Sequence, residues 1–286
     1  MRGEAKLRSR AWKYRASILM WLLFAAIAVT LWLTLGNVFY LFNFLYIGTS
    51  LAVGLALAAG KHPHFRVVTQ FLVGTYMLVF LGVIGHENMQ IEGFWYYLLL
   101  GVFEGATIHY LVAKIAGPAL FGRGWCGYCC WTAAILDLLP YKAAGTGRRR
   151  SLAPIRYVAL AGSLALVVGL MAFASADMDA IMWWLFLAGN AAYYAVGLAM
   201  AVALRDNRAF CKYVCPVGLL MKPAAHVALL HVSCDTTACI HCGKCTRVCP
   251  MGVDVPRECA VSRRRSTECI LCGKCVDACP VKALRM

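Results

Sequence analysis

The sequence contains few charged residues for a chain of its length. Asp, Glu, Lys and Arg together make up 14% of the 286 residues, whereas 62% of the residues are hydrophobic. Soluble globular domains have about 25% charged residues. The shortage of charge therefore excludes an ordinary soluble domain and indicates that much of the surface faces lipid.

Acidic residues are especially scarce: the sequence has 13 Asp and Glu residues but 28 Lys and Arg residues. Apolar runs predict about six membrane-spanning helices, at residues 17–35, 38–60, 67–85, 94–113, 157–174 and 181–204. The Lys and Arg residues then lie on one side or at that side's helix ends, and the opposite loops carry Glu87, Glu92, Asp177 and Asp179. By the positive-inside rule, both termini are expected in the cytoplasm.

Nucleic-acid binding is disfavoured by the placement of the basic residues. The basic excess follows the expected topology, so it indicates a multi-pass protein of a bacterial inner membrane and not a nucleic-acid-binding protein. The first apolar run is too long for a cleavable signal and lacks a cleavage site, which predicts a retained anchor. The sequence also shows no nucleophile beside an evident base, so enzymatic activity stays an open question.

Cysteine, by contrast, is abundant, and 8 of the 15 cysteines form a duplicated motif. The pattern C-x2-C-x2-C-x3-C-P occurs at residues 239–250, the first repeat, and at residues 269–280, the second repeat. This spacing is typical of bacterial proteins with two iron–sulfur clusters, in which the fourth Cys of each repeat ligates the other cluster. The predicted ligands of two [4Fe-4S] clusters are therefore Cys239, Cys242, Cys245 and Cys279 for one, and Cys269, Cys272, Cys275 and Cys249 for the other.

Two further segments pair an aromatic residue with Cys-x3-Cys, at residues 122–131 and 208–218. Each follows a predicted span on the same side of the membrane. We call Cys126, Cys130, Cys211 and Cys215 the thiol quartet, and we predict that it forms an additional redox or metal site. Apolar filling of the helix ends is the alternative, and the sequence leaves open whether Cys129 replaces Cys130. Cys234 and Cys259 lie outside both patterns and are interpreted as spare.

The fourth predicted span contains two ionisable residues, Glu104 and His109. Ionisable groups within a membrane are costly and normally face a bundle interior, a cavity or each other. Glu104 and His109 are therefore candidates for contact with a quinone headgroup or for a proton path. A structural hydrogen bond explains them equally well.

These patterns predict an α-helical integral membrane bundle followed by a C-terminal α+β ferredoxin domain with two clusters. The expected boundaries are residues 1–206 for the transmembrane domain, 207–231 for a Cys-x3-Cys-Pro element with an interfacial linker, and 232–286 for the ferredoxin-type domain.

Residues 122–286 resemble the membrane-bound polyferredoxins that accompany periplasmic nitrate reductase, methylamine dehydrogenase, nitrous oxide reductase and haem-copper oxidase assembly. The resemblance is carried by Gly122-Arg-Gly-Trp-Cys-Gly-Tyr128 with Cys130, by Phe210-Cys-Lys-Tyr-Val-Cys-Pro-Val-Gly218, and by the two repeats. The first element departs from the family pattern, because Trp131 stands where the family has Pro. The size and the terminal ferredoxin domain are most similar to the nitrate-reductase and methylamine-utilisation members.

The resemblance implies electron transfer between cytoplasmic-side [4Fe-4S] clusters and a membrane quinone or quinol, or a periplasmic redox enzyme system. The implied partners are membrane lipid, a soluble or membrane redox protein and a quinone. The alternative is a redox maturation factor that reduces a metal ion or a disulfide during assembly of a metalloenzyme. An enzyme assignment would rest on this resemblance alone, as a quinol-linked oxidoreductase component.

Overall fold

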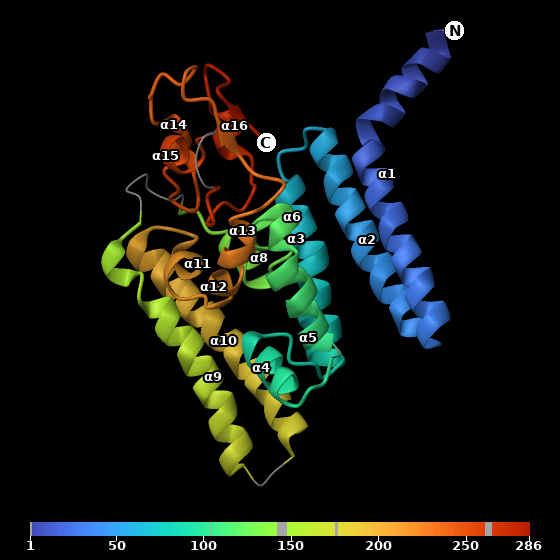
Figure 1. Ribbon diagram of the computed structural model, residues 1–286, viewed down its shortest axis with the longest axis vertical. Coiled ribbons are helices and arrows are strands. Elements are labelled where there is room, and N and C mark those ends of the chain that lie inside the picture. The colour runs from blue at the N-terminus through green and yellow to red at the C-terminus, as the bar shows by residue number, and fades with distance from the viewer. Residues whose placement is uncertain (1, 104, 142–147, 175–176, 261–264) are drawn as a thin grey trace. The chain divides into compact units, whose positions relative to one another are not determined.

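The computed structural model describes residues 2–103, 105–141, 148–174, 177–260 and 265–286 (Figure 1). Side chains are described over these ranges from residue 14 onwards, except at residue 150. The chain divides into two compact units, unit 1 at residues 1–75 and unit 2 at residues 76–286. Each unit is considered by itself below.

Unit 1 is a helical hairpin followed by a third helix. It contains α1 (Arg2–Leu35), α2 (Val38–Ala59) and α3 (Phe65–Thr75). Gly36 permits the turn between α1 and α2 because its φ of +68° suits a residue without Cβ, and Asn37 caps α2 by accepting a hydrogen bond from Phe39 N. The Ser17 hydroxyl donates to Ala52 O at 2.6 Å, which joins the two helices of the hairpin.

Unit 2 combines long helices with many short elements. Before its long helices it contains η1 (Tyr76–Ile84), α4 (Ile91–Leu99), α5 (Gly105–His109), η2 (Tyr110–Ala116), α6 (Pro118–Phe121), α7 (Gly124–Tyr128), α8 (Trp131–Leu136) and η3 (Arg150–Leu152). The long helices are α9 (Ile155–Phe173) and α10 (Met178–Leu204). The remaining elements are α11 (Ala209–Tyr213), α12 (Val217–Leu220), α13 (Lys222–Ala225), β1 (Ser233–Cys234), α14 (Lys244–Val248), α15 (Val255–Glu258), α16 (Lys274–Asp277) and β2 (Leu284–Arg285).

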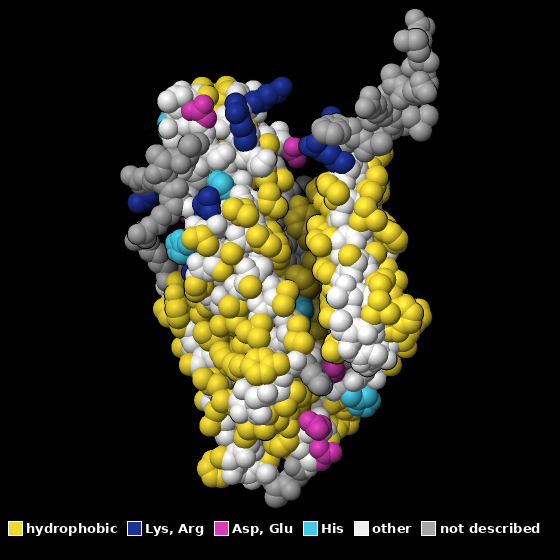
Figure 2. Space-filling view, turned by 45° about the vertical axis from the view of Figure 1, so that its right-hand side comes forward, with side chains coloured by type: hydrophobic (Ala, Val, Ile, Leu, Met, Phe, Trp, Pro, Cys, Tyr) yellow, Lys and Arg dark blue, Asp and Glu magenta, His cyan; other side chains and the backbone are white. Residues whose placement is uncertain are grey.

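Five of the expected membrane spans have a matching helix. Within the described residues, five helices are long and apolar enough to cross a membrane: Tyr14–Leu35, Val38–Ala59, Phe65–Ile84, Ile155–Phe173 and Met178–Leu204. Hydrophobic side chains cover much of the visible helix surface in Figure 2, as expected for helices whose outer faces contact lipid. The protein is therefore a multi-pass membrane protein.

The fourth expected span, at residues 94–113, differs from the prediction. Residues 94–113 do not form one helix, because the chain breaks between α4 and α5, where Gly101 and Gly105 have φ values of +71° and +39°. Glycine adopts such values at little cost, and hydropathy alone does not detect the break. The return toward the ferredoxin domain is made by α5, η2 and α6, which follow one another from Gly105 to Phe121 (Figure 1).

The ferredoxin domain is closed by its first and last segments. Strands β1 and β2 pair antiparallel, with Ser233 opposite Arg285 and Cys234 opposite Leu284. Its buried apolar residues belong to the same core as residues of the Cys-x3-Cys segments, including Cys126, Phe210 and Cys211. Because hydrophobic burial is continuous across the two regions, they are held in a defined arrangement within unit 2.

Candidate functional site

Two cavities in the ferredoxin domain are each lined by cysteines from both repeats. The first cavity is lined by Cys239, Cys242 and Cys245 of the first repeat and by Cys279 of the second. The second cavity is lined by Cys269, Cys272 and Cys275 of the second repeat and by Cys249 of the first. The structure thus brings together the same four thiols in each cavity that the motif spacing groups as one ligand set.

The backbone around the two cavities is nearly the same. His241 and Gly243 have φ values of +52° and +69°, and Leu271 and Gly273, at the equivalent positions, have +54° and +74°. The fourth thiol of each repeat accepts a backbone N–H bond, from Val253 N to Cys249 Sγ at 3.4 Å and from Ala283 N to Cys279 Sγ at 3.3 Å. Such N–H donors stabilise negative charge on a ligating sulfur.

The donor set fits polynuclear iron–sulfur clusters. Among the described residues, no three His, Cys, Asp or Glu side chains converge closely enough to hold one metal ion. Instead, four thiols surround about 340 Å³ of space in the first cavity and about 370 Å³ in the second, space open to solvent included. Thiolate is the usual protein ligand of iron–sulfur clusters. Burial raises the pKa of Cys269 and of Cys275 to about 12, so a bound cation is needed to deprotonate these thiols.

Cys234 and Cys259, which the sequence analysis interpreted as spare, lie at these cavities. Cys234 lines the first cavity and Cys259 lines the second. Cys234 N donates to Cys259 O at 2.7 Å, so one backbone bond joins the walls of the two cavities. Sequence spacing gave no signal for this role, because neither residue belongs to a repeated motif.

The second repeat packs directly against the first Cys-x3-Cys segment. The Tyr128 hydroxyl donates to Leu271 O at 2.8 Å. A Cβ at Gly127 would collide with Ile270 O, and the place of a Cβ at Gly124 lies 3.6 Å from Leu271 Cδ1. Glycine at residue 127 therefore permits the close approach of the two loops.

The thiol quartet is gathered beside this contact, on α7, α11 and the residues that follow each helix. Cys211 and Cys215 both interact electrostatically with Cys126 and Cys130. Burial raises the pKa of Cys211 to about 11 and that of Cys215 to about 12. These contacts place Cys130, whose choice over Cys129 the sequence left open, near the second Cys pair.

Each pair of the quartet is preceded by a buried arginine. Arg123 lies three residues before Cys126 and Arg208 three residues before Cys211, and each guanidinium is 3.9 Å from the Sγ of its own Cys. Arg208 also binds both carboxylate oxygens of Asp137, at 2.7 and 2.5 Å, and donates to Cys126 O at 3.0 Å. Arg208 therefore links the second Cys-x3-Cys segment to the first.

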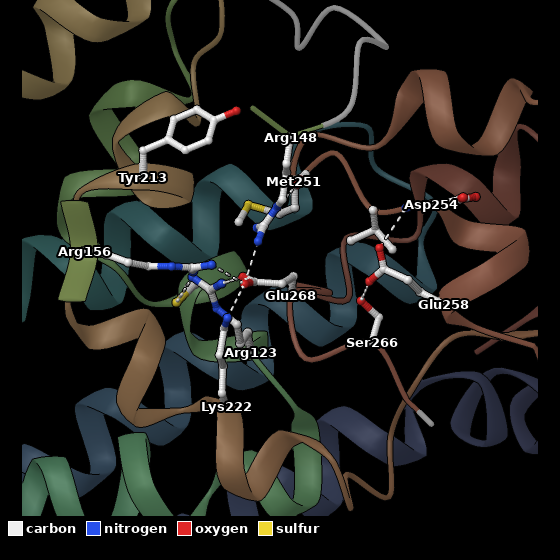
Figure 3. Close-up of polar contacts among 12 residues, drawn as sticks. Arg123, Arg148, Arg156, Tyr213, Lys222, Met251, Asp254, Glu258, Ser266 and Glu268 are labelled. Carbon is white, nitrogen blue, oxygen red and sulfur yellow. Dashed lines mark hydrogen bonds and ion pairs between the residues drawn. The ribbon is translucent and has the colours of Figure 1, made fainter. Parts of the chain in front are cut away.

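A buried carboxylate, Glu268, holds the start of the second repeat. Figure 3 shows four cationic side chains directed at it. Arg123 contacts Oε2, and Arg148, Arg156 and Lys222 lie 2.5, 2.9 and 3.0 Å from Oε1. These five side chains form what we call the Glu268 cluster. Its cations come from the loop before α7, the segment before η3, α9 and α13.

The charges within the Glu268 cluster decide the state of the carboxyl group. Burial alone would raise the pKa of Glu268, but Arg123, followed by Arg148 and Arg156, outweighs burial and holds this pKa well below its ordinary value of 4.5. The side chains of Glu268 and Arg123 are 8% and 1% exposed. The cluster therefore attaches the residue before Cys269 to the helical part of unit 2 through ionised groups.

His109 lies near the thiol quartet, whereas Glu104 is outside the described residues. The His109 ring packs against Trp125, the neighbour of Cys126, with ring centroids 4.8 Å apart. Lys114 Nζ lies 4.5 Å from the centre of the same indole ring. Nε2 of His109 has no hydrogen-bond partner among the described residues. His109 is therefore available to a further polar group.

Comparison with known families finds matches over both cysteine-rich regions. The family described as "4Fe-4S dicluster domain" matches residues 238–284, which contain both repeats. The family described as "4Fe-4S binding domain" matches residues 109–145 and 180–231, which contain the thiol quartet.

Known proteins match over longer and shorter stretches. The methylamine utilization ferredoxin-type protein MauN of Methylobacillus flagellatus is 26% identical over 212 residues, covering 65% of this chain and 74% of that protein. The chain is similar to the membrane-bound polyferredoxins. The two matched families indicate that it binds iron–sulfur clusters.

Two other relatives match over a smaller part of their length. YccM of Escherichia coli strain K12, named as a candidate electron transport protein, is 30% identical over 69 residues. An uncharacterized protein of Methanocaldococcus jannaschii is 33% identical over 64 residues. The matched regions span 19% and 26% of these two proteins. No solved structure matches this chain.

Proposed function

We propose that this protein lies in the inner membrane of a bacterium. There it passes electrons between a soluble partner in the cytoplasm and either a quinone or a periplasmic redox system. The observation that supports this most strongly is the joint lining of each cavity by cysteines of both repeats, beside a further group of thiols. When bound, a [4Fe-4S] cluster accepts and releases single electrons.

The residues that hold the clusters follow from the two cavities. Cys239, Cys242, Cys245 and Cys279 hold one [4Fe-4S] cluster, and Cys269, Cys272, Cys275 and Cys249 hold the other. Val253 N–H and Ala283 N–H stabilise charge on the two crossed ligands. The Tyr128 hydroxyl donates to the backbone of Leu271, between Cys269 and Cys272, and so helps to position these two ligands.

The thiol quartet is proposed to hold a thiolate-ligated redox centre larger than one metal ion, and not a disulfide. Arg123 and Arg208 lie 3.9 Å from two of its sulfurs, and Lys114 interacts electrostatically with Cys126, Cys130 and Cys215. Asp137 neutralises Arg208, but Glu268 is shared by four cations, so positive charge is in excess beside the quartet and favours negative groups there. Thiolates would supply that charge, whereas a disulfide is neutral. This argues against the disulfide form of the maturation-factor alternative.

His109 is proposed to contact the headgroup of a quinone. Its free Nε2 and its packing against Trp125 support this role, because the imidazole can donate to or accept from a quinone oxygen beside the quartet. The variant His109→Leu should lower the rate of oxidation by a soluble quinone analogue about fivefold, which corresponds to the loss of one neutral hydrogen bond of about 1 kcal/mol. Its iron content should stay unchanged. An unchanged rate would assign His109 a structural role.

The main experiment is spectroscopy of the anaerobically purified full-length protein. We expect iron and inorganic sulfide for at least two cubanes, absorbance that bleaches on reduction, and recovery of the absorbance when a quinone analogue is added. Iron well below two cubanes would refute the cofactor assignment. If the protein stayed reduced after a quinone analogue was added, the proposal that a quinone is its acceptor would be refuted. Reporter fusions at the C-terminus test the cytoplasmic location.

A further inference from the structure

The two repeats differ in exposure at equivalent positions. Ile240 is 60% exposed, whereas Ile270, its counterpart, is 2% exposed. His241 is exposed and Leu271 is buried, although both have the same left-handed backbone conformation. Cys242 is the exposed member of the 15 cysteines. The loop at residues 240–241, beside the first cavity, therefore faces solvent, whereas the equivalent loop at residues 270–271, beside the second cavity, is buried.

Exposed cations surround this part of the first cavity. Lys244 lines the cavity, and Arg247 donates to Cys242 O at 3.2 Å. Lys282 follows Val281, which lines the cavity and is 41% exposed. Figure 2 shows Lys and Arg side chains projecting from the end of unit 2 that carries the ferredoxin domain. We call Ile240, Cys242, Lys244, Arg247, Val281 and Lys282 the first-repeat face.

We propose that the first-repeat face is the docking surface for a soluble one-electron carrier with an acidic surface around its own cofactor. This inference rests on the proposed function and names the partner's chemistry. Exposed apolar residues at the centre with charges around them are typical of interfaces between proteins. Opposite charges on the two partners speed association and orient the encounter.

The acidic residue Asp235 lies beside the face, because its N–H donates to Ala283 O, next to Lys282. Asp235 is engaged by its own turn, where Oδ1 accepts bonds from Thr237 N at 2.9 Å and from Thr237 Oγ1 at 2.6 Å. It also interacts with Arg285, which lies outside the face as defined. The face itself contains three cations and no acidic residue. An acidic protein surface is therefore its complement.

A soluble protein fits the face better than the membrane surface does. The second repeat, and not the first, contacts the helical part of unit 2 through Tyr128 and the Glu268 cluster. The exposed loop of the first repeat consequently has no such contact with the helical part among the described residues. A [4Fe-4S] cluster held by Cys239, Cys242, Cys245 and Cys279 would accept one electron from the carrier in each encounter, and no bond would form or break and no proton would move.

The test measures reduction of the full-length protein in discs of neutral phosphatidylcholine by a reduced flavodoxin of acidic pI. The variant carries Lys244→Glu and Lys282→Glu. Its matched control is Lys274→Glu, because Lys274 is the exposed counterpart of Lys244 in the second repeat. We expect the second-order rate constant of the double variant to fall about tenfold at low ionic strength, and the difference to disappear at high salt. The control should change less than about twofold.

Three outcomes would overturn the proposal. Equal effects in the double variant and the control would place docking elsewhere, and a rate without salt dependence would remove the role of charge. A loss that occurs only in discs with anionic lipid would assign the face to the membrane. Reduction by the methyl viologen radical, a small cation, separates this inference from the proposed function. If viologen reduces the variant normally, docking alone has changed; if it reduces neither protein, the electron-transfer function itself fails.

Discussion

The two repeats share spacing and backbone conformation but have different surroundings. Between the first two cysteines, the first repeat has Ile240 and His241, and the second has Ile270 and Leu271. The first pair faces solvent and the second is buried against the segment at residues 122–128. Equal motifs therefore do not imply equal roles, because the environment of a cluster and its access to partners depend on what packs around it.

The residue before each repeat shows the same contrast. Glu268 is buried among four cations, whereas Ala238, its counterpart, is exposed. The Glu268 cluster therefore attaches the start of the second repeat to the helical part of unit 2. Ala238 offers no charge for such a cluster at the start of the first repeat, although Arg148 donates to Met251 O directly after that repeat.

The largest expected effect tests the crossing of ligands between the repeats. Cys279→Ser should disrupt the centre of the first cavity, and Cys249→Ser that of the second, each removing roughly half of the iron that the two cavities hold. Spectra of the two variants should differ, because the exposed first-cavity centre alone is lost in Cys279→Ser. If Cys279→Ser instead abolished the centre held by Cys269, Cys272 and Cys275, the crossed assignment would be wrong.

The next effect concerns the attachment of the second repeat. Glu268→Gln leaves buried cations without their carboxylate and should lower the free energy of local opening by about 3–5 kcal/mol. Hydrogen exchange at residues 269–272 measures this opening. Ala238→Gln, the matched control in the first repeat, should stay within about 0.5 kcal/mol of the wild type. A similar loss in both variants would contradict the contrast between the repeats.

The Glu268 contribution should also be constant over the pH range in which the protein is handled. The folded-state pKa lies below the ordinary value of 4.5, so the carboxylate contributes its full stability above that value. The contribution is lost only as the pH falls through the depressed folded-state pKa. Hydrogen-exchange rates can be corrected for the intrinsic pH dependence of exchange. Between pH 6 and pH 8, roughly the range of maximal protein stability, the corrected rates should give a constant difference in the free energy of local opening between the wild type and Glu268→Gln. If this difference in free energy fell between pH 6 and pH 8, another group that titrates in this range would be responsible.

A smaller effect is expected from the paired isoleucines. Ile270→Ala removes a side chain that is 2% exposed and should cost about 2–5 kcal/mol of local stability. Ile240→Ala removes a side chain that is 60% exposed and should cost less than about 0.5 kcal/mol. Hydrogen exchange of the two loops compares them directly. Equal losses would mean that the first loop is covered by a contact within the protein.

The smallest effect comes from a single hydrogen bond. Tyr128→Phe removes the donor to Leu271 O and should cost about 0.5–1.5 kcal/mol, with faster exchange in the second repeat. Tyr46→Phe is the matched control, because its hydroxyl donates to Leu72 O within unit 1 at 3.1 Å. That control should leave exchange in both repeats unchanged. An effect of Tyr46→Phe on the second repeat would show that the loss is not local.

Several features could be predicted because they depend on local pattern. Apolar length predicted the spans at α1, α2, α9 and α10, and motif spacing grouped the thiols that line each cavity. The break between α4 and α5 escaped prediction, because apolar content continues across Gly101 and Gly105 while the backbone changes direction. The roles of Cys234 and Glu268 also escaped, since their partners come from distant segments; Arg123 is 145 residues from Glu268.

Two properties follow from residues close together along the chain and could be read from it directly: the membrane spans, and the two sets of thiols with ferredoxin spacing. The different exposure of the two loops, with Ile270 buried in the second repeat and Ile240 exposed in the first, became visible only in the folded molecule. The physical reason is that burial and ion pairing depend on which remote segments pack together, and a repeated local motif carries no information about its neighbours in space.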